Sequence, residues 1–571
     1  MASPRRFAPS LLLLCSSMLV SAPLAAQAPA YDLIIRGGTL YDGSGKPPVV
    51  GDVAIKDDRI VAVGKVEGEA KREVAAKGMA VAPGFINMLS WATESLIADP
   101  RSQSDIRQGV TLEVMGEGWS MGPMNATMKR QETERQGDIK YDIEWTTLGD
   151  YFGWLEKRGI STNIASFVGA ATVRVHELGE GDVDPNPEQL GRMRALVRQA
   201  MNEGAMGVGS SLIYAPGNFA ETDELVALTT ESARCGGMYI SHMRSEGDRL
   251  LEAVDELIEI ARRRGGPAEI YHLKMAGRDN WDKLPEVVKR IEAARAEGLR
   301  ITTDMYTYTA GATGLDAAMP LWVQDGGVER WIERLKDPAV RARVAAEMKR
   351  PGQGWENLYF GAGPDKMILV GFKQEAMKQY TGKTLAEMAK LWGMSPEETA
   401  MELVVRDESR VGTVYFLMSE DNVRRQVQLP WMGFGSDAEA RAPEGVFLKS
   451  STHPRAYGNF ARALGKYARD EQAAQLPDLI RRMTSFPATN LGIKGRGVLR
   501  DGYYADVVVF DPAKVQDHAT FEKPQQLSTG VRDVFVNGTQ VLKDDKHTGA
   551  KPGRFVRGPG WTGWPGGGAC K

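Results

Sequence analysis

Four polar residues, each placed just after a short apolar segment of this 571-residue chain, could converge on one cation. They are Glu117 in V-M-G-E-G-W-S, His242 in Y-I-S-H-M-R, His272 in E-I-Y-H-L-K and Asp437 in G-F-G-S-D. Imidazole nitrogens and carboxylate oxygens bind zinc, and a catalytic zinc site keeps one position open for water. The sequence therefore predicts a hydrolytic metal centre held by Glu117, His242 and His272.

The spacing of the two histidines supports this interpretation. His242 and His272 are 30 residues apart, about one strand-helix unit, so they should occupy equivalent points on neighbouring strands. Strands lie about 4.8 Å apart, and two imidazoles can then reach one ion at about 2.0 Å each. Because alternate strand residues face the same way, Lys274 and Arg244 should point into the same region. For Asp437, a helix-capping role is an equal alternative at this stage.

The middle of the chain alternates short apolar segments with amphipathic helices, a pattern typical of parallel α/β folds. Residues 250–264, for example, have apolar residues at helical spacing, basic residues in the last turn and a stop at Gly265. Eight such units predict a closed (β/α)8 TIM barrel, whose functional residues lie at the C-terminal strand ends. The candidate strands are 85–89, 111–115, 165–168, 206–210, 238–242, 269–274, 301–306 and 432–436.

Other segments frame this barrel. Both chain ends carry period-two alternation, which indicates strands of one small β-sandwich domain. About 120 residues separate the last two candidate strands, and their helical patterns predict an α-rich inserted subdomain placed as a lid. The predicted organisation is a signal peptide at 1–28, a β-sandwich domain from 29–84 and 490–560, a barrel at 85–489 with the insertion at 311–430, and a flexible tail at 561–571.

Composition excludes some classes of partner. Charged residues make up 25% of the chain and the net charge is -3, which is not the basic excess of a nucleic-acid-binding protein. We therefore expect a small-molecule substrate and no nucleic acid. Outside the N-terminal region the chain has only Cys235 and Cys570, which we do not expect to form a disulfide framework.

The N-terminus indicates export. Arg5 and Arg6 precede an apolar run at residues 11–20 and a small-x-small cleavage motif at residues 26–28. The run is shorter than the ~20 residues that a membrane-spanning helix needs. The sequence therefore predicts a periplasmic or secreted bacterial protein without a membrane anchor after signal cleavage.

Several motifs, taken in order along the chain, resemble the N-acyl-D-amino-acid deacylases (D-aminoacylases) of the amidohydrolase superfamily. The likeness extends from about Tyr31 to Gly558. It is carried by A-P-G-F-I, G-V-T, S-H-M-R-S-E-G-D, Y-H-L-K, D-M-Y-T-Y-T-A-G, G-S-D, H-P-R-A-Y-G and G-Y-Y-A-D-V-V-V-F-D-P. The resemblance implies a metal-dependent barrel with a small β-sandwich, acting on a linear amide next to a carboxylate.

The same resemblance implies roles for individual residues. These roles are metal binding, general base catalysis and binding of the substrate's α-carboxylate. They fall on His242 and His272 as the tightly held zinc ligands, Glu117 where the family has a cysteine, Asp437 as the general base, and Lys274, Tyr306 and Arg455 as the carboxylate-binding groups.

The first barrel strand departs from the family pattern. The family has an H-x-H pair there that helps to bind a second, weaker metal, whereas this chain has Leu89 and Trp91, with Asn87 before them. We therefore expect side chains to fill the second site, which leaves one divalent metal ion per chain. Glu117 stands where the family has a cysteine, and its carboxylate oxygen suits zinc and also manganese or cobalt.

These features predict a mononuclear hydrolase that cleaves the amide bond of N-acyl amino acids, of D configuration according to the resemblance. Asp437 would accept a proton as water attacks the carbonyl and deliver it to the departing amine. A dipeptidase is the second interpretation, because it differs only in the acyl group. The third is a binding or scaffold protein disabled by the loss of H-x-H, which metal content would distinguish from an enzyme.

Overall fold

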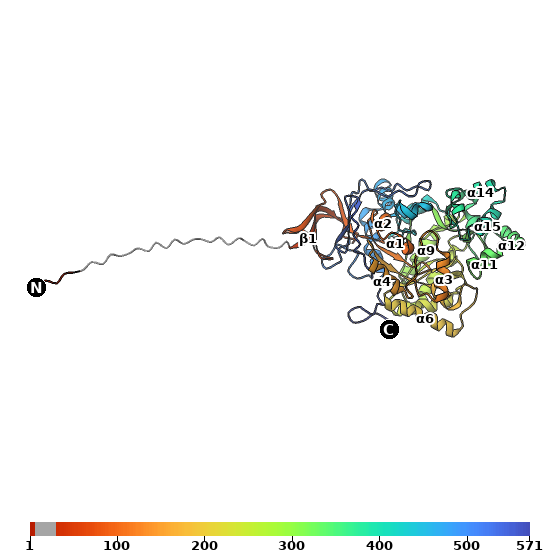
Figure 1. The fold of residues 1–571 in the computed structure, drawn as a ribbon, viewed down its shortest axis with the longest axis horizontal. Helices are drawn as coiled ribbons and strands as arrows, with labels where there is room; N and C mark the ends of the chain where they lie inside the picture. The colour runs from red at the N-terminus through yellow and green to blue at the C-terminus, as the bar shows by residue number, and fades with distance from the viewer. Residues whose placement is uncertain (6–29, 571) are drawn as a thin grey trace.

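The computed structural model describes residues 1–5 and 30–570. The predicted signal peptide at residues 1–28 falls almost entirely outside these described ranges. A β-sheet domain lies at one end of the molecule, the barrel lies in the middle, and a mainly helical insertion lies at the other end (Figure 1). Within the described ranges, every helix is too short or too polar to cross a membrane.

Eight parallel strand positions form the barrel, as the sequence predicts. The ring closes between the first and last strands, where the Met88 amide donates to the Phe434 carbonyl (3.1 Å) and Ser90 pairs with Ala438. The strands in order around the ring are β6 (Phe85–Asn87), β7 (Val110–Met115), the consecutive pair β8 (Asn163–Ser166) and β9 (Val168–Gly169), β10 (Gly207–Ser211), β11 (Met238–His242), β12 (Ala268–Ile270), β13 (Ile301–Met305) and β17 (Met432–Phe434).

Amphipathic helices pack around the barrel strands. In α8 (Leu250–Arg264) the apolar residues, such as Val254 and Leu257, are buried, three arginines occupy the last turn, and Gly265 ends the helix at φ +70°. Basic residues there stabilise the negative end of the helix dipole, and glycine adopts this φ without strain. The helices that contact barrel strands include α1 (Ala92–Ala98), α5 (Ala170–Leu178), α6 (Pro187–Glu203), α7 (Thr222–Arg234), α8 (Leu250–Arg264), α9 (Leu284–Ala296) and α18 (Leu476–Met483).

The two chain ends build one nine-stranded sheet. Its N-terminal and C-terminal halves join where β5 (Ala80–Pro83) pairs antiparallel with β18 (Val507–Phe510), with Val81 opposite Val509. Both of these valines are fully buried, so the two ends share one hydrophobic core. The strands are β1 (Tyr31–Leu40), β2 (Val49–Lys56), β3 (Arg59–Gly64), β4 (Ala70–Ala75), β5 (Ala80–Pro83), β18 (Val507–Phe510), β19 (Val531–Val536), β20 (Thr539–Lys543) and β21 (Lys546–His547).

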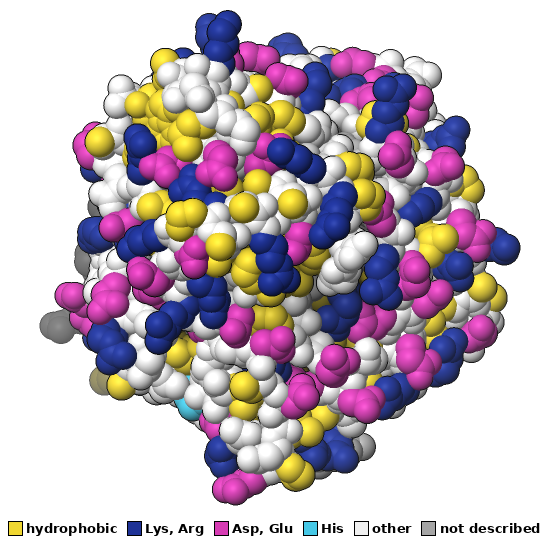
Figure 2. All heavy atoms as spheres, turned by 90° about the vertical axis from the view of Figure 1, so that its right-hand side faces the viewer, with side chains coloured by type: hydrophobic (Ala, Val, Ile, Leu, Met, Phe, Trp, Pro, Cys, Tyr) yellow, Lys and Arg dark blue, Asp and Glu magenta, His cyan; other side chains and the backbone are white. Residues whose placement is uncertain are grey.

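The insertion between β13 and β17 has its own hydrophobic core. It contains helices, as expected, and also a three-stranded antiparallel sheet that the sequence patterns did not reveal. On its outer face, acidic and basic side chains are interspersed (Figure 2). Its main elements are β14 (Ala310–Gly314), β15 (Met367–Gly371), β16 (Gly412–Phe416), α11 (Val328–Arg334), α12 (Pro338–Met348), α14 (Leu385–Trp392) and α15 (Pro396–Asp407).

The C-terminal tail is attached to the barrel by a disulfide. Cys235, at the end of α7, is bonded to Cys570. The sequence analysis expected no disulfide framework from these two cysteines, and it did not predict this single bond. They are 335 residues apart, and only the folded chain brings them together. The Gly-rich tail also bonds to the barrel, since the Thr562 amide donates to the Asn202 carbonyl (3.1 Å).

Candidate metal and substrate site

The three predicted metal ligands come together at the end of β11 and just beyond the ends of β7 and β12. Glu117 lies between Gly116 and Gly118, which have φ of +104° and +71°. A Cβ at Gly118 would lie 2.0 Å from the Ser211 hydroxyl oxygen, so only glycine allows this close packing. His272 also has a positive φ, of 33°, a strained conformation that occurs mostly at functional sites.

Glu117 bridges the two histidines. Its Oε1 lies 3.0 Å from His242 Nδ1 and 2.8 Å from His272 Nε2, and all three residues are at most 4% exposed. Burial alone would raise the pKa of Glu117, but the charge of His272 and the hydrogen bonds from both imidazoles outweigh it and hold the pKa below its ordinary value. The Glu117 side chain is therefore ionised.

This donor set fits a metal ion. One oxygen and two imidazole nitrogens, each from a different residue, lie within 4.8 Å of one another. A tetrahedral ion bound at about 2.0 Å separates its ligand atoms by about 3.3 Å, only slightly more than the two contacts observed here. The geometry therefore brings together the three ligands that the sequence predicted, Glu117, His242 and His272.

Glu246 is a site residue that the sequence analysis missed. Its Oε1 accepts a hydrogen bond from Lys274 Nζ (2.7 Å) and lies 3.0 Å from His272 Nδ1. Burial would lower the pKa of Lys274, but the Glu246 carboxylate outweighs it and raises that pKa, so Lys274 stays charged. The signal for Glu246 that the sequence offered was its position four residues after His242, in H-M-R-S-E.

Asp437 follows β17 and has both carboxylate oxygens in contact with other side chains. Its Oδ2 lies 2.8 Å from Arg455 Nη1, and its Oδ1 accepts a hydrogen bond from Trp91 Nε1 (3.2 Å). The same Trp91 N–H donates to Glu117 Oε2 at 3.0 Å. Burial raises the pKa of Asp437 above its ordinary value, although the Arg455 guanidinium opposes this. A carboxylate with a raised pKa is better suited to exchange protons near neutral pH.

The three residues predicted to hold a carboxylate also lie together. The Tyr306 ring centroid is 4.4 Å from Arg455 Cζ and 5.5 Å from Lys274 Nζ. Burial raises the pKa of Tyr306 to about 12, against the effect of these two cations, so its hydroxyl remains a donor. Among the described residues this buried hydroxyl has no hydrogen-bond partner. Two cations and an unused donor suit a substrate anion.

His453 and Arg244, which lie near the site, have structural roles. His453 Nε2 contacts the Ala310 carbonyl (2.8 Å), and its Nδ1 accepts the Arg455 amide hydrogen bond, which fixes the start of the helix that carries Arg455. Strand alternation predicted that Arg244 points toward the metal site, and this prediction is wrong. It donates to Glu256 on α8 (2.9 Å), because β11 ends at His242 and the strand alternation stops there.

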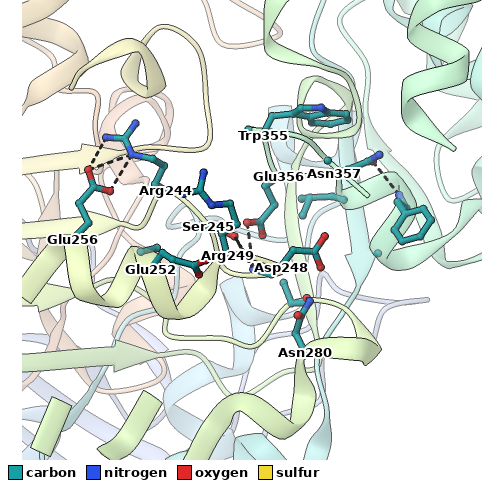
Figure 3. Close-up of a pocket in the computed structure, with 18 of the residues that line it drawn as sticks. Arg244, Ser245, Asp248, Arg249, Glu252, Glu256, Asn280, Trp355, Glu356 and Asn357 are labelled. Carbon is teal, nitrogen blue, oxygen red and sulfur yellow. Dashed lines mark hydrogen bonds and ion pairs between the residues drawn. The ribbon is translucent and has the colours of Figure 1, made fainter. Parts of the chain in front are cut away.

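The site residues line a cavity of about 560 Å³ whose far wall comes from the insertion, including Thr313, Leu358 and Arg410. A second cavity of about 500 Å³ lies behind the loop after β11. Figure 3 shows Glu356 of the insertion next to this loop. The Glu356 carboxylate accepts the Glu246 amide hydrogen bond at 2.6 Å. The insertion thus holds the loop that supplies Glu246 to the site.

Relatives of this chain have similar sequences over most of their length. The D-aminoacylase of Alcaligenes xylosoxydans xylosoxydans is 31% identical over 531 residues, which cover 92% of this chain and 97% of the relative. The N-acyl-D-glutamate deacylase of the same organism is 31% identical over 528 residues, covering 92% of this chain and 96% of the relative.

Solved structures of similar proteins superpose on most of this chain. The crystal structure of a D-aminoacylase superposes with a TM-score of 0.75 at 30% identity and covers 92% of this chain and 100% of its own. An N-acyl-D-glutamate deacylase from Bordetella bronchiseptica, complexed with zinc and a phosphonate inhibitor, gives a TM-score of 0.75 at 28% identity, covering 92% and 99%. The family model described as the amidohydrolase family matches residues 72–542, and the chain belongs to that family.

Proposed function

We propose that this protein hydrolyses N-acyl-D-amino acids to a carboxylate and a free D-amino acid, using one divalent metal ion per chain, zinc in the first instance. The observation that carries the proposal is the convergence of Glu117, His242 and His272 in one buried cluster. The D configuration is supported by the names of the relatives, a D-aminoacylase and an N-acyl-D-glutamate deacylase.

The metal-binding residues are held in place by their neighbours. When bound by Glu117, His242 and His272, the ion would supply Lewis-acid activation of water and of the amide carbonyl. Glu246 contacts His272 Nδ1 on the side away from Glu117 and so orients that imidazole. Carboxylates in this position typically fix the ring of a metal-binding histidine and make it a stronger ligand.

Asp437 is the general base and acid in this proposal. It accepts a proton as a water oxygen bonds to the amide carbon, and it returns the proton to the nitrogen as the carbon–nitrogen bond breaks. Its burial and raised pKa suit both steps. The capping alternative considered for Asp437 loses support, because its side chain contacts Trp91 and Arg455.

Lys274, Arg455 and Tyr306 bind the free carboxylate of the substrate. Arg455 presents a planar fork of donors that can grip a carboxylate with two parallel hydrogen bonds. Lys274 lies near the same Tyr306 ring as Arg455 and adds a charge, and the Tyr306 hydroxyl adds a donor. In this proposal the amide next to that carboxylate lies between the metal-binding cluster and Asp437.

The surroundings fit a small substrate. A cavity of about 560 Å³ lies in the size range of small-molecule sites. The export motif at the N-terminus supports a periplasmic or secreted location, where the protein would act on N-acyl-D-amino acids outside the cytoplasm. Fractionation of cells that express the full chain tests this location; recovery in the cytoplasm would contradict it.

The direct test is a panel of N-acetyl-D-amino acids, N-acetyl-L-amino acids and free dipeptides, assayed with zinc-reconstituted protein. We expect hydrolysis of N-acetyl-D-amino acids and loss of activity in the double variant His242→Ala/His272→Ala. Faster hydrolysis of dipeptides would favour the dipeptidase interpretation. No hydrolysis by a zinc-loaded chain would support the binding or scaffold interpretation.

A further inference from the structure

Trp91 joins the proposed base to one of the metal ligands. Its indole N–H donates to Glu117 Oε2 at 3.0 Å and to Asp437 Oδ1 at 3.2 Å. Two carboxylates that face the same point repel each other unless a cation or a hydrogen-bond donor lies between them. The indole nitrogen is a donor only, so it suits this position and cannot itself bind a metal ion.

Leu89, two residues before Trp91, has only apolar side-chain atoms and so offers no metal ligand. Its side chain is fully buried among the apolar residues that fill the barrel interior, including Ile86, Met88 and Tyr271. A Cβ placed on Gly435 of the neighbouring strand would lie 2.9 Å from Leu89 Cβ, so the two backbones pack tightly here. The Leu89 carbonyl also accepts the Asp437 amide hydrogen bond (2.9 Å), which fixes the backbone of the proposed base.

We propose that Trp91 is a positioning residue whose indole N–H takes the place of a second cation between Glu117 and Asp437, which makes this a site for a single metal. The inference rests on the proposed function for the role of Asp437. A D-aminoacylase of known structure, 30% identical to this chain, is described as having a binuclear metal centre. In that protein one metal activates and the second attenuates. An indole is covalently part of the chain, so it bridges the two carboxylates at any metal concentration.

The first consequence concerns excess zinc. Trp91 and Leu89 occupy the region where a second cation would lie between Glu117 and Asp437. The hydrolytic activity should therefore rise to a plateau at about one zinc ion per chain. It should then stay within about twofold of that plateau when zinc is in tenfold excess. A fall in activity that follows binding of a second zinc ion would contradict the proposal.

The variant Trp91→Phe removes the N–H and keeps an aromatic ring. Partners that orient metal ligands typically contribute 10–100-fold to metal affinity or activity. We expect about tenfold weaker zinc binding, measured by competition with a chelator, and about tenfold lower kcat with KM within about twofold. The matched control is Trp154→Phe, which loses a 2.8 Å indole bond to Glu144 outside the site. Equal zinc affinity and kcat in the two variants would overturn the proposal.

The double variant Leu89→His/Trp91→His tests the same idea by metal content, without an activity assay and without relying on Trp91→Phe to fold. It restores two imidazoles where Leu89 and Trp91 now lie, and we expect bound zinc to rise from one to two ions per chain. A count that stays at one would contradict the assignment. If the parent hydrolyses no N-acyl-D-amino acid, the proposed function fails, while zinc affinity and zinc count still decide the role of Trp91.

Discussion

Arg455 and Asp437 form a largely buried ion pair, with 2.8 Å between Nη1 and Oδ2. The residue proposed to bind the substrate therefore also holds the proposed base. A substrate carboxylate that takes over the Arg455 guanidinium would release one oxygen of Asp437. Substrate binding and readiness of the base are thus coupled in this geometry.

Arg455→Lys should weaken substrate binding more than it slows turnover. Lysine keeps the charge but cannot grip a carboxylate with two parallel hydrogen bonds. We expect KM for an N-acetyl-D-amino acid to rise about 10–100-fold, measured by steady-state kinetics. The control Arg424→Lys changes a half-exposed arginine that pairs with Asp421, three residues before it, and does not line the site cavity, so it should leave KM unchanged. An unchanged KM in Arg455→Lys would remove Arg455 from the carboxylate site.

Asp437→Asn should abolish turnover while metal remains bound. The amide keeps the size of the side chain but cannot accept the proton, and a general base typically contributes 10²–10⁴-fold to the rate. Kinetics and elemental analysis on the same sample separate the two effects. The exposed Asp421→Asn serves as control. Activity within a few-fold of the parent would exclude Asp437 as the base.

Glu246→Gln should weaken zinc binding about 10–100-fold, because it removes the carboxylate that orients His272 and pairs with Lys274. Competition with a chelator measures this effect independently of activity. The same change in Glu259, an exposed partner of Arg262, provides the matched control. Unaltered zinc affinity would show that Glu246 only fills space.

Glu94 should make stability depend on pH. Burial, helped by the charge of Glu132, raises the pKa of Glu94 to about 7. The folded chain then binds this proton more tightly than the unfolded chain. Its contribution is fully present below about pH 4.5 and is lost as the pH rises through about 7.

The variant Glu94→Gln removes this loss of stability at high pH. By urea unfolding it should match the parent near pH 4.5 and be more stable at pH 7.5 by up to about 3 kcal/mol. Glu67→Gln, at an exposed position, should differ from the parent at neither pH. A Glu94→Gln difference that is equal at both pH values would contradict the assignment.

Periodic patterns predicted the barrel and the pairing of His242 with His272, whereas the roles of Asp437, Tyr306 and Arg455 were implied by the family resemblance. His242 and His272 recur one strand-helix unit apart, and the parallel pairing of β11 with β12 brings their imidazole centroids to 4.5 Å. The three-stranded sheet of the insertion was not predicted, since its strands lie far apart in sequence with helices between them.

Other features depend on local turns or on distant contacts. Arg244 points away from the site because strand alternation ends at His242, whereas the turn that follows brings Glu246 back to it. The Cys235–Cys570 bond and the two hydrogen bonds of Trp91 join residues that the sequence separates widely. Such contacts follow from the folded structure and not from spacing.

The metal content of the purified protein tests the central claim most directly. After reconstitution with zinc and removal of the excess, elemental analysis should find about one ion per chain, and His242→Ala/His272→Ala should bind none. A parent protein that binds no ion, or a double variant that keeps its ion, would contradict the site formed by Glu117, His242 and His272.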